Sequence, residues 1–228
     1  MRSLATLLFL SGLVFLLLVL TASLPFGRPP MLVGDAIAQA AANEVGAANF
    51  VTAVVLGYRG LDTLGELSIL FAAATAGGLV LGASRGATHR RPAGFILRAG
   101  ADVLFPLLLI VGLYIVMHGH LTPGGGFQGG VVLAAAFFLP LLARPQASID
   151  HRWLTVTEGL AGTAFIAIGL IALFNDQPFL TPLLDKGMLG DLVSGGTLPL
   201  LYLAVGLKVG AELASLLSRL ASDDEAAS

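Results

Sequence analysis

The sequence predicts an all-α membrane protein, and two features carry that prediction. Hydrophobic residues make up 56% of the chain and charged residues only 11%, which is less than half the charged share of a soluble domain. Several apolar runs reach the roughly 20 residues that a helix needs to cross a bilayer. No cysteine is present, which excludes a disulfide framework, a cysteine-ligated zinc and an iron–sulfur cluster. The expected architecture is a polytopic protein with about six transmembrane helices.

Residues 3–24 form the first apolar run. A signal peptide is the rival interpretation, because Arg2 supplies a charged start and Thr21-Ala22-Ser23 is a run of small residues. The run is longer than the apolar core of a signal peptide, which is typically about 7–15 residues. We therefore expect it to remain as a membrane helix.

The next stretch, residues 25–60, changes character. Three prolines follow the first run and should end its helix. Residues 35–48 are rich in alanine and carry polar residues about one helical turn apart. This pattern predicts a short surface helix with one polar, solvent-facing stripe. The stripe consists of Asp35, Gln39, Asn43 and Glu44. Residues 49–60 are moderately apolar and indicate no clear element.

Five further spans are expected at residues 63–83, 99–117, 123–143, 154–174 and 195–217. The first of these opens on a capping box, with Thr63 as N-cap and Glu66 reaching back to its amide. Pro106 should kink the next span. Thr122 and Pro123 read as the N-cap and first residue of the span after that.

Charge between the spans predicts the topology. Residues 84–98 form a basic hydrophilic loop, and residues 175–194 a longer polar connection. With the N-terminus in the cytoplasm, most basic residues outside the spans lie inside, as the positive-inside rule requires. The inner set is Arg2, Arg85, Arg90, Arg91, Arg98, Arg144, Arg152 and Arg219, and the outer set is Arg28, Arg59 and Lys186. Both termini should then be cytoplasmic, and the turn around residues 118–123 should face outward.

The spans and loops divide the chain into four segments. They are an N-terminal membrane part at 1–84, a basic cytoplasmic linker at 85–98, a four-helix membrane domain at 99–220 and an acidic tail at 221–228, which should be frayed at its end.

A glycine-rich turn joins the third and fourth spans. It runs His-Gly-His-Leu-Thr-Pro-Gly-Gly-Gly-Phe-Gln-Gly-Gly from residue 118. Its glycines and proline are Pro123, Gly124, Gly125, Gly126, Gly129 and Gly130. Glycines four residues apart let another helix approach closely in a membrane. The turn is therefore either a tight helix entry with close packing or a backbone-lined element beside a polar path.

His118, His120 and Gln128 accompany this turn. Two histidines with no third ligand nearby are a weak metal signal. Hydrogen-bonded turn residues, or members of a proton path through their near-neutral pKa, are the better interpretations. The stretch lacks the lysine and hydroxyl residue of a phosphate-binding loop. We expect no metal and no cofactor.

The segment GLYIVMHGHLTPGGGFQGGVVLAAAF resembles the B subunit of multisubunit Mrp/Mnh-type cation/proton antiporters. The same domain recurs in membrane-bound hydrogenase-type and sulfane-reductase-type complexes. The family phrase RGHxxPGGGFxxG is matched from His118 onward, with histidine in place of the usual arginine and Gln128 at a variable position.

A second resemblance covers residues 44–83. The phrase YRGLDTLGE at 58–66 is similar to the small E subunit of membrane-bound hydrogenases, which is equivalent to the end of the large A subunit of Mrp antiporters. The two resemblances meet at the basic loop and imply a fusion of an E-like and a B-like module. The stretch 196–213 resembles the hydrogenase-type B subunits more than the antiporter ones.

Charged side chains within the spans are the candidates for chemistry, because a charge at mid-bilayer costs about 3 kcal/mol or more. Glu66 completes the capping box on the residues alone, whereas the resemblance implies a place in a region proposed to line a cation or proton route. A carboxylate there could hold Na⁺ with oxygen ligands or pass a proton. Asp62 either belongs to the same path or forms an interfacial ion pair with Arg59. Such an exposed pair contributes little to stability.

Lys208 lies near the centre of the sixth span, with Glu212 four residues later on the same face. The two form either a neutralised pair, in which Lys208 snorkels or docks a partner helix, or part of a proton-transfer chain. Asp102 and Glu158 lie near cytoplasmic helix ends, where local pairing or an interaction with the helix N-terminus is expected.

The sequence thus predicts a non-catalytic membrane subunit of an Mrp-like antiporter module in a prokaryotic inner membrane. It would contribute to, or support, the Na⁺/H⁺ path beside other membrane subunits, with no role for nucleic acid. The alternative is a structural scaffold of a membrane-bound hydrogenase-type or other redox-driven respiratory complex. A stand-alone transporter is disfavoured because no inverted repeat is visible.

Overall fold

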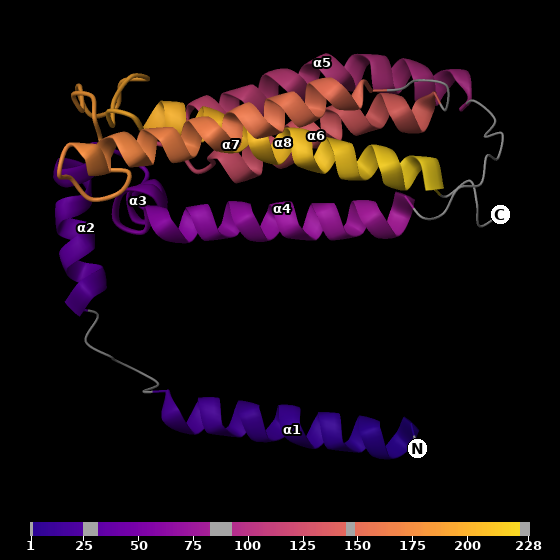
Figure 1. Cartoon of the computed structure of the whole chain (residues 1–228), viewed down its shortest axis with the longest axis horizontal. Helices are drawn as coiled ribbons and strands as arrows, with labels where there is room; N and C mark the ends of the chain where they lie inside the picture. The colour runs from indigo at the N-terminus through magenta and orange to yellow at the C-terminus, as the bar shows by residue number, and fades with distance from the viewer. Residues whose placement is uncertain (1, 25–31, 83–92, 145–148, 224–228) are drawn as a thin grey trace. The chain divides into compact units, whose positions relative to one another are not determined.

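The computed structural model describes residues 2–24, 32–82, 93–144 and 149–223 (Figure 1). The chain divides into two compact units, Met1–Ile37 and Ala38–Ser228. The first unit holds α1 (Arg2–Ser23) and the start of α2 (Leu32–Val45). The polar stripe of α2 is largely exposed, as predicted.

The second unit holds the other long helices, which are α4 (Gly60–Gly82), α5 (Phe95–Met117), α6 (Gly126–Ala143), α7 (His151–Phe174) and α8 (Leu198–Asp223). With α1 they make six helices long and apolar enough to span a membrane. Helix α2 and the short pair α3 (Phe50–Thr52) and η1 (Ala53–Tyr58) bend by 91° and form a further broken span or re-entrant element. The predicted all-α architecture with six spans is confirmed for the described residues.

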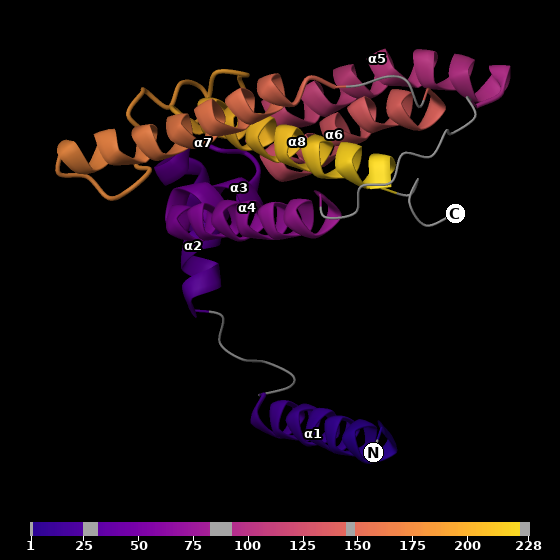
Figure 2. The ribbon, with the colours of Figure 1, turned by 45° about the vertical axis from the view of Figure 1, so that its right-hand side comes forward.

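Helix α8 is the core of the second unit. It contacts α4, α5, α6 and α7. Of the residues in its most apolar 18-residue stretch, 56% are buried, against 11% for the corresponding stretch of α4. Figures 1 and 2 show α8 between α4 and the α5–α6 pair in both views. Side chains carried by α8 therefore meet several other helices, whereas α4 has much surface left for lipid or another subunit.

Glycines on α6 allow this close packing. A Cβ atom at Gly126 would lie 2.5 Å from Val205 Cβ, and one at Gly130 would lie 2.9 Å from the carbonyl oxygen of Gly206, both on α8. A Cβ atom at Gly129 would lie 2.8 Å from the carbonyl oxygen of Gly112 on α5. Helix α6 therefore touches a neighbouring backbone on two faces, which only glycine permits.

The start of α6 differs from the prediction. The helix begins at Gly126, and Thr122 and Pro123 lie in the preceding turn rather than at its N-cap and first position. Gly125 has a φ of 137°, which a helix cannot contain, and a Cβ there would lie 2.7 Å from the ring of Tyr202. The chain passes over Tyr202 before it can turn into the helix, so the capping rule fails here.

The start of α4 also differs, and no capping box forms. Helix α4 begins at Gly60, so Thr63 lies inside its first turn, and its hydroxyl donates to the carbonyl of Val55 at 2.8 Å. The residues before it already form the π-helix η1. Because the chain enters α4 almost directly from another helical turn, Thr63 is not at the free helix end that an N-cap requires.

Smaller differences concern helix ends. Helix α5 starts at Phe95, so the last four residues of the predicted basic loop are helical, while Arg85, Arg90 and Arg91 lie outside the described residues. Helix α7 starts at His151, and the carboxylate of Asp150 caps it by accepting from the Arg152 amide at 2.8 Å. Helix α8 continues to Asp223, into the tail at 221–228 that is predicted to fray, and residues 224–228 lie outside the described part.

Candidate functional site

Three charged side chains meet where α8 packs against α7. Lys208 Nζ lies 3.2 Å from Glu212 Oε2 and 3.6 Å from Glu158 Oε1. The side chains of Lys208 and Glu212 are 11% and 2% exposed, and that of Glu158 is 19% exposed. The Lys208 ammonium also lies 5.1 Å from the centroid of the Phe71 ring on α4. Three helices therefore close around one ammonium group.

The sequence places these groups by simple spacing. Lys208 and Glu212 are one turn apart on α8 and face the same side. Glu158 comes from α7, where Gly162 follows one turn later. A Cβ at Gly162 would lie 3.5 Å from Lys208 Cδ, so the lysine stem passes over this glycine to reach both carboxylates.

The three charges do not cancel. Two carboxylates face one ammonium, which leaves one negative charge in a segment that is long and apolar enough to span a membrane. Glu212 Oε1 is buried and has no hydrogen-bond partner among the described residues. An uncompensated charge in an apolar environment is strongly unfavourable. The arrangement therefore calls for one more proton or cation.

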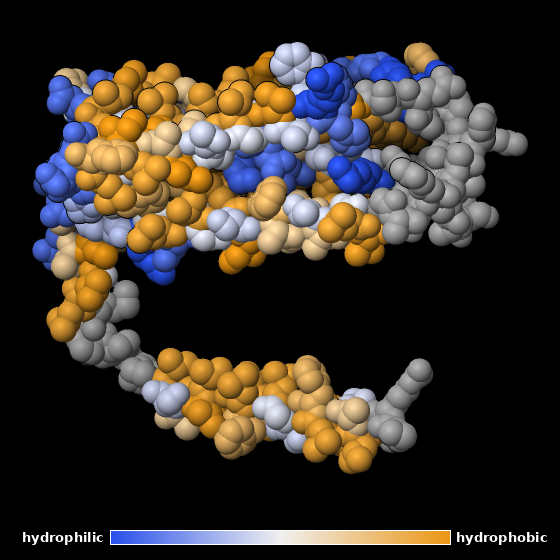
Figure 3. Space-filling view, in the orientation of Figure 1, coloured by the Kyte–Doolittle hydropathy of each residue, from blue (hydrophilic) through white to orange (hydrophobic). Residues whose placement is uncertain are grey.

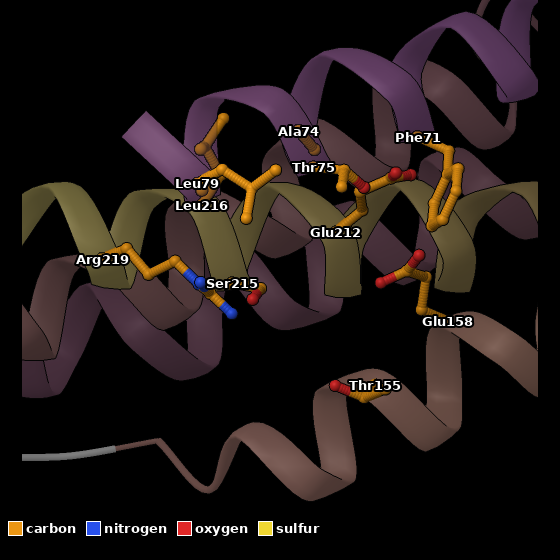
Figure 4. Close-up of a pocket in the computed structure, with 11 residues that line it drawn as sticks. Phe71, Ala74, Thr75, Leu79, Thr155, Glu158, Glu212, Ser215, Leu216 and Arg219 are labelled. Carbon is orange, nitrogen blue, oxygen red and sulfur yellow. The ribbon is translucent and has the colours of Figure 1, made fainter. Parts of the chain in front are cut away.

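A cavity of about 240 Å³ opens beside these charges, between α4, α7 and α8 (Figure 4). Its polar lining consists of Thr75, Thr155, Glu158, Glu212, Ser215 and Arg219. In Figure 4 the carboxylate of Glu158 extends from α7 toward α8. Figure 3 shows hydrophilic side chains interrupting the apolar surface of this part of the bundle. The cavity is thus a polar opening within an apolar helix bundle.

Glu66 lines a second cavity, of about 150 Å³, that also touches α4 and α8. Thr63, Gln128 and Tyr202 line it as well. The Glu66 side chain is exposed in this chain. Because α4 contributes residues 63 and 66 to one cavity and residues 71 and 75 to the other, the two cavities lie at successive levels of the α4–α8 interface. Asp62 is not in either cavity and forms an exposed ion pair with Arg59.

The two histidines of the glycine-rich turn point to different places. His118 stacks on Tyr114 with ring centroids 4.1 Å apart. His120 is fully buried, with Nε2 3.4 Å from the carbonyl oxygen of Asp191. No group of three histidine, aspartate or glutamate side chains in the described part of the chain is placed to hold a metal.

Two residues that no sequence motif marked hold this turn. The Asn49 amide donates to the carbonyls of Gly119 and Thr122 at 2.7 and 2.9 Å. The Thr52 hydroxyl donates to the Gly119 carbonyl at 2.6 Å and accepts from the Tyr202 hydroxyl at 2.5 Å. These bonds join the segment before α4 to the turn before α6, about 70 residues later in the chain, and no short-range pattern indicates them.

Glu158 is the third residue whose role the sequence did not predict. Its expected role was local pairing or a helix N-terminus interaction, but it contacts Lys208 on another helix. The one available signal was the pair Glu158 and Gly162, a charge and a small residue on the same face of a largely apolar helix. That pattern is typical of a helix–helix contact in membranes. Asp102 likewise pairs with Arg144, at the end of α6, at 2.5 Å.

The pKa of His120 is held below the ordinary histidine value of 6.5, because burial disfavours the charged ring; the contact with the Asp191 carbonyl opposes this. The folded turn therefore favours neutral His120. Its contribution to stability is complete above about pH 6.5 and is lost as the pH falls toward the lowered pKa.

We accordingly expect the turn to loosen in mild acid. The amides of Leu121 and Thr122, which donate to the His118 carbonyl, should exchange faster at about pH 5 than at pH 7.5 after correction for intrinsic rates. Hydrogen-exchange mass spectrometry of the purified complex would measure this. His120→Gln should flatten the pH dependence, and His118→Gln should weaken it only in part, because repulsion from His118 lowers the His120 pKa less than burial does. An unchanged pH profile in His120→Gln would contradict the assignment.

These features define a polytopic α-helical membrane protein with ionisable side chains between its spans. The family model of the domain related to the MnhB subunit of Na⁺/H⁺ antiporters matches residues 96–215. The chain therefore belongs to this family, which confirms the B-type resemblance.

Two relatives illustrate the family. An uncharacterised protein of Methanocaldococcus jannaschii is 30% identical over 198 residues, covering 73% of this chain and 74% of that protein. A protein described as antiporter subunit mnhB2 of Staphylococcus aureus is 33% identical over 92 residues, covering 38% of this chain and 63% of that protein. This chain thus spans a little less than two thirds of the second relative.

Two solved structures share the fold. A chain of the membrane-bound sulfane sulfur reductase, an archaeal respiratory membrane complex, is 42% identical with a TM-score of 0.82, covering 96% of this chain and 97% of that one. A chain of the Mrp complex of Dietzia sp. DQ12-45-1b is 28% identical with a TM-score of 0.74, covering 96% of this chain but 26% of that one. The chain is a membrane subunit of an Mrp-type antiporter or a related respiratory complex.

Proposed function

We propose that the α4–α8 interface of this chain carries part of a cation or proton path through a multisubunit membrane complex. The observation that carries the proposal is the buried group of Lys208, Glu212 and Glu158, in which two carboxylates face one ammonium. Apolar side chains of similar volume pack as well or better than a buried ion pair. A group of charges with one unmatched carboxylate is therefore poorly suited to packing alone and well suited to exchanging a proton or cation.

The path would use both cavities in turn. One contains Glu66 and lies near the glycine-rich turn, and the other contains Glu158 and Glu212 and reaches Arg219. With basic residues on the inside, the Arg219 end faces the cytoplasm and the turn at 118–123 faces outward. Both termini are then cytoplasmic, in the inner membrane of a prokaryote. Na⁺ and H⁺ are the ions proposed to move.

The segment order supports a two-part chain, with residues 44–83 as the E-like module and the family domain at 96–215 as the B-like module. The parent complex that fits best is a redox-driven respiratory complex, because similarity to the sulfane sulfur reductase chain extends over 97% of that chain at 42% identity. The chain has no cysteine to hold an iron–sulfur cluster, so a cluster of that kind would be bound by other subunits of the complex.

A scaffold is the second candidate, favoured by the exposed apolar face of α4. Ile69, Leu79 and Val80 are each more than two thirds exposed within this chain. Such a face can bind a neighbouring subunit without any ion moving. Under this alternative, neutralising Glu66 leaves transport unchanged, whereas disturbing α6 packing prevents assembly.

Replacing Glu66 by glutamine tests the path. We expect the complex to assemble and ion exchange in everted membrane vesicles to fall by at least about tenfold, because a neutral amide cannot carry the charge that a passing cation or proton needs. Asp62→Asn is the matched control, since Asp62 lies outside both cavities in an exposed pair, and it should retain exchange. Full exchange in Glu66→Gln would remove Glu66 from the path and favour the scaffold.

A further inference from the structure

We propose that the cavity between α4, α7 and α8 binds one small monovalent cation, with the carboxylates of Glu158 and Glu212 as its charged ligands. This deepens the function proposed above and rests on it. The site lies away from Glu66 and from the glycine-rich turn, which line the other cavity.

The free carboxylate oxygens are the first step of the argument. Lys208 Nζ pairs with Oε2 of Glu212 and lies near Oε1 of Glu158. Glu212 is 2% exposed and lines the cavity, yet its Oε1 has no partner among the described residues. A buried carboxylate oxygen without a partner is strongly unfavourable. Glu212 therefore lines the cavity with a carboxylate of which one oxygen is left without a partner by the described residues.

Neutral oxygen donors complete the lining. The hydroxyl-bearing residues Thr75, Thr155 and Ser215 line the same space, one from each helix (Figure 4). Carboxylate and hydroxyl oxygens are the donors that hard cations prefer, and no soft thiolate ligand is available because the chain lacks cysteine. A volume of about 240 Å³ is several times the roughly 30 Å³ that a water occupies in the liquid. A small cation with part of its hydration shell therefore fits.

The net charge of the ionisable groups beside the cavity determines the valence of the cation that the site would bind. The ionisable groups facing the cavity region are Glu158 on α7 and Lys208, Glu212 and Arg219 on α8, with none from the α4 lining. Arg219 lies at the exposed end of the lining, about two turns beyond Glu212. At the buried end, two carboxylates and one ammonium leave a charge of minus one. A monovalent cation neutralises it, whereas a divalent cation leaves an excess positive charge and an anion adds to the negative one.

A proton on either carboxylate achieves the same neutrality. The cation and the proton therefore compete for one site, and occupancy by one excludes the other. This competition gives a readout that does not depend on transport, because an apolar carbodiimide reacts with protonated carboxyl groups and a bound cation protects them.

The experiment uses the purified intact complex and a carbodiimide, with labelling of Glu158 and Glu212 mapped by mass spectrometry in NaCl or in choline chloride at equal ionic strength. We expect labelling of both glutamates to be several-fold slower in NaCl than in choline chloride. Glu158→Gln should abolish the sodium protection of Glu212. Glu66→Gln, in the other cavity, should retain it.

If the labelling is too weak to quantify, the thermal transition of the complex provides a second measurement of sodium binding. Sodium should raise the thermal transition of the wild-type and Glu66→Gln complexes above its value in choline chloride, but not that of Glu158→Gln. If Glu158→Gln fails to assemble, Glu158→Asp, which keeps the charge at a shorter reach, should show weakened protection instead. Equal labelling and equal transitions in both salts would overturn the cation site.

The outcomes separate this site from the proposed path. Loss of exchange in Glu66→Gln together with no sodium effect at Glu158 and Glu212 would leave the path standing and reject the cation site. Sodium protection together with full exchange in Glu66→Gln would establish the site and reject Glu66 as part of the path.

Discussion

Lys208→Met is expected to destabilise the assembled complex by about 3–5 kcal/mol, the usual effect of removing one partner of a buried ion pair. Methionine fills a similar volume but leaves Glu212 and Glu158 facing each other without a cation. Both carboxylates must then take up protons or draw in water. Thermal denaturation of the purified complex, followed by loss of the native elution peak, measures the effect.

A double substitution separates charge from packing. Lys208→Met with Glu212→Gln removes one charge of each sign and should recover most of the lost stability. Arg144→Met is the matched control, because it breaks the exposed pair with Asp102 and should change stability little. A Lys208→Met complex as stable as the wild type, with no gain from the double substitution, would show that the three groups are not energetically coupled.

Gly129→Ala is expected to separate α5 from α6 and destabilise the protein by about 1–3 kcal/mol, as overpacking of a tight core does. The new Cβ would clash with Val116 Cγ2, and would lie 2.8 Å from the Gly112 carbonyl oxygen and 2.9 Å from the Val116 amide nitrogen. The last two atoms are backbone and cannot rotate away. The measurement is the yield of intact complex on a native gel together with its thermal transition.

The matched control is Gly100→Ala, also in a membrane helix, where no atom lies within 4 Å of the new Cβ. Alanine there should be neutral or stabilise by up to about 1 kcal/mol, since it is the better helix former. Adding Val116→Ala to Gly129→Ala should restore stability only in part, because the contact with the Gly112 carbonyl remains. Equal behaviour of the Gly129 and Gly100 variants would contradict the close packing.

Much of the fold could be predicted because hydrophobicity in a membrane is a strong and local signal. Each predicted span is a helix, and the errors lie mainly at helix starts. At Thr122 the capping rule fails because Gly125 takes a positive φ over Tyr202. At Thr63 it fails because the chain is already helical in η1. Both causes lie outside the four or five residues that a capping pattern considers.

The candidate site could be predicted in part for the same reason. Lys208 and Glu212 are one turn apart on one helix, so their pairing follows from spacing alone. Glu158 joins them only because α7 turns that face toward α8, and Asn49 reaches Gly119 only through the tertiary fold. Rotation of a helix about its axis is set by packing against its neighbours, which a single sequence does not specify.

The bonds from Asn49 and Thr52 to the turn at 118–122 have a consequence for stoichiometry. Both partners belong to one polypeptide, so their association is intramolecular and does not weaken on dilution. In an arrangement of separate subunits the same contact would depend on protein concentration and on balanced synthesis. Here each copy of the turn at 118–122 is synthesised together with one copy of the segment that carries Asn49 and Thr52, so the two are always present in a one-to-one ratio.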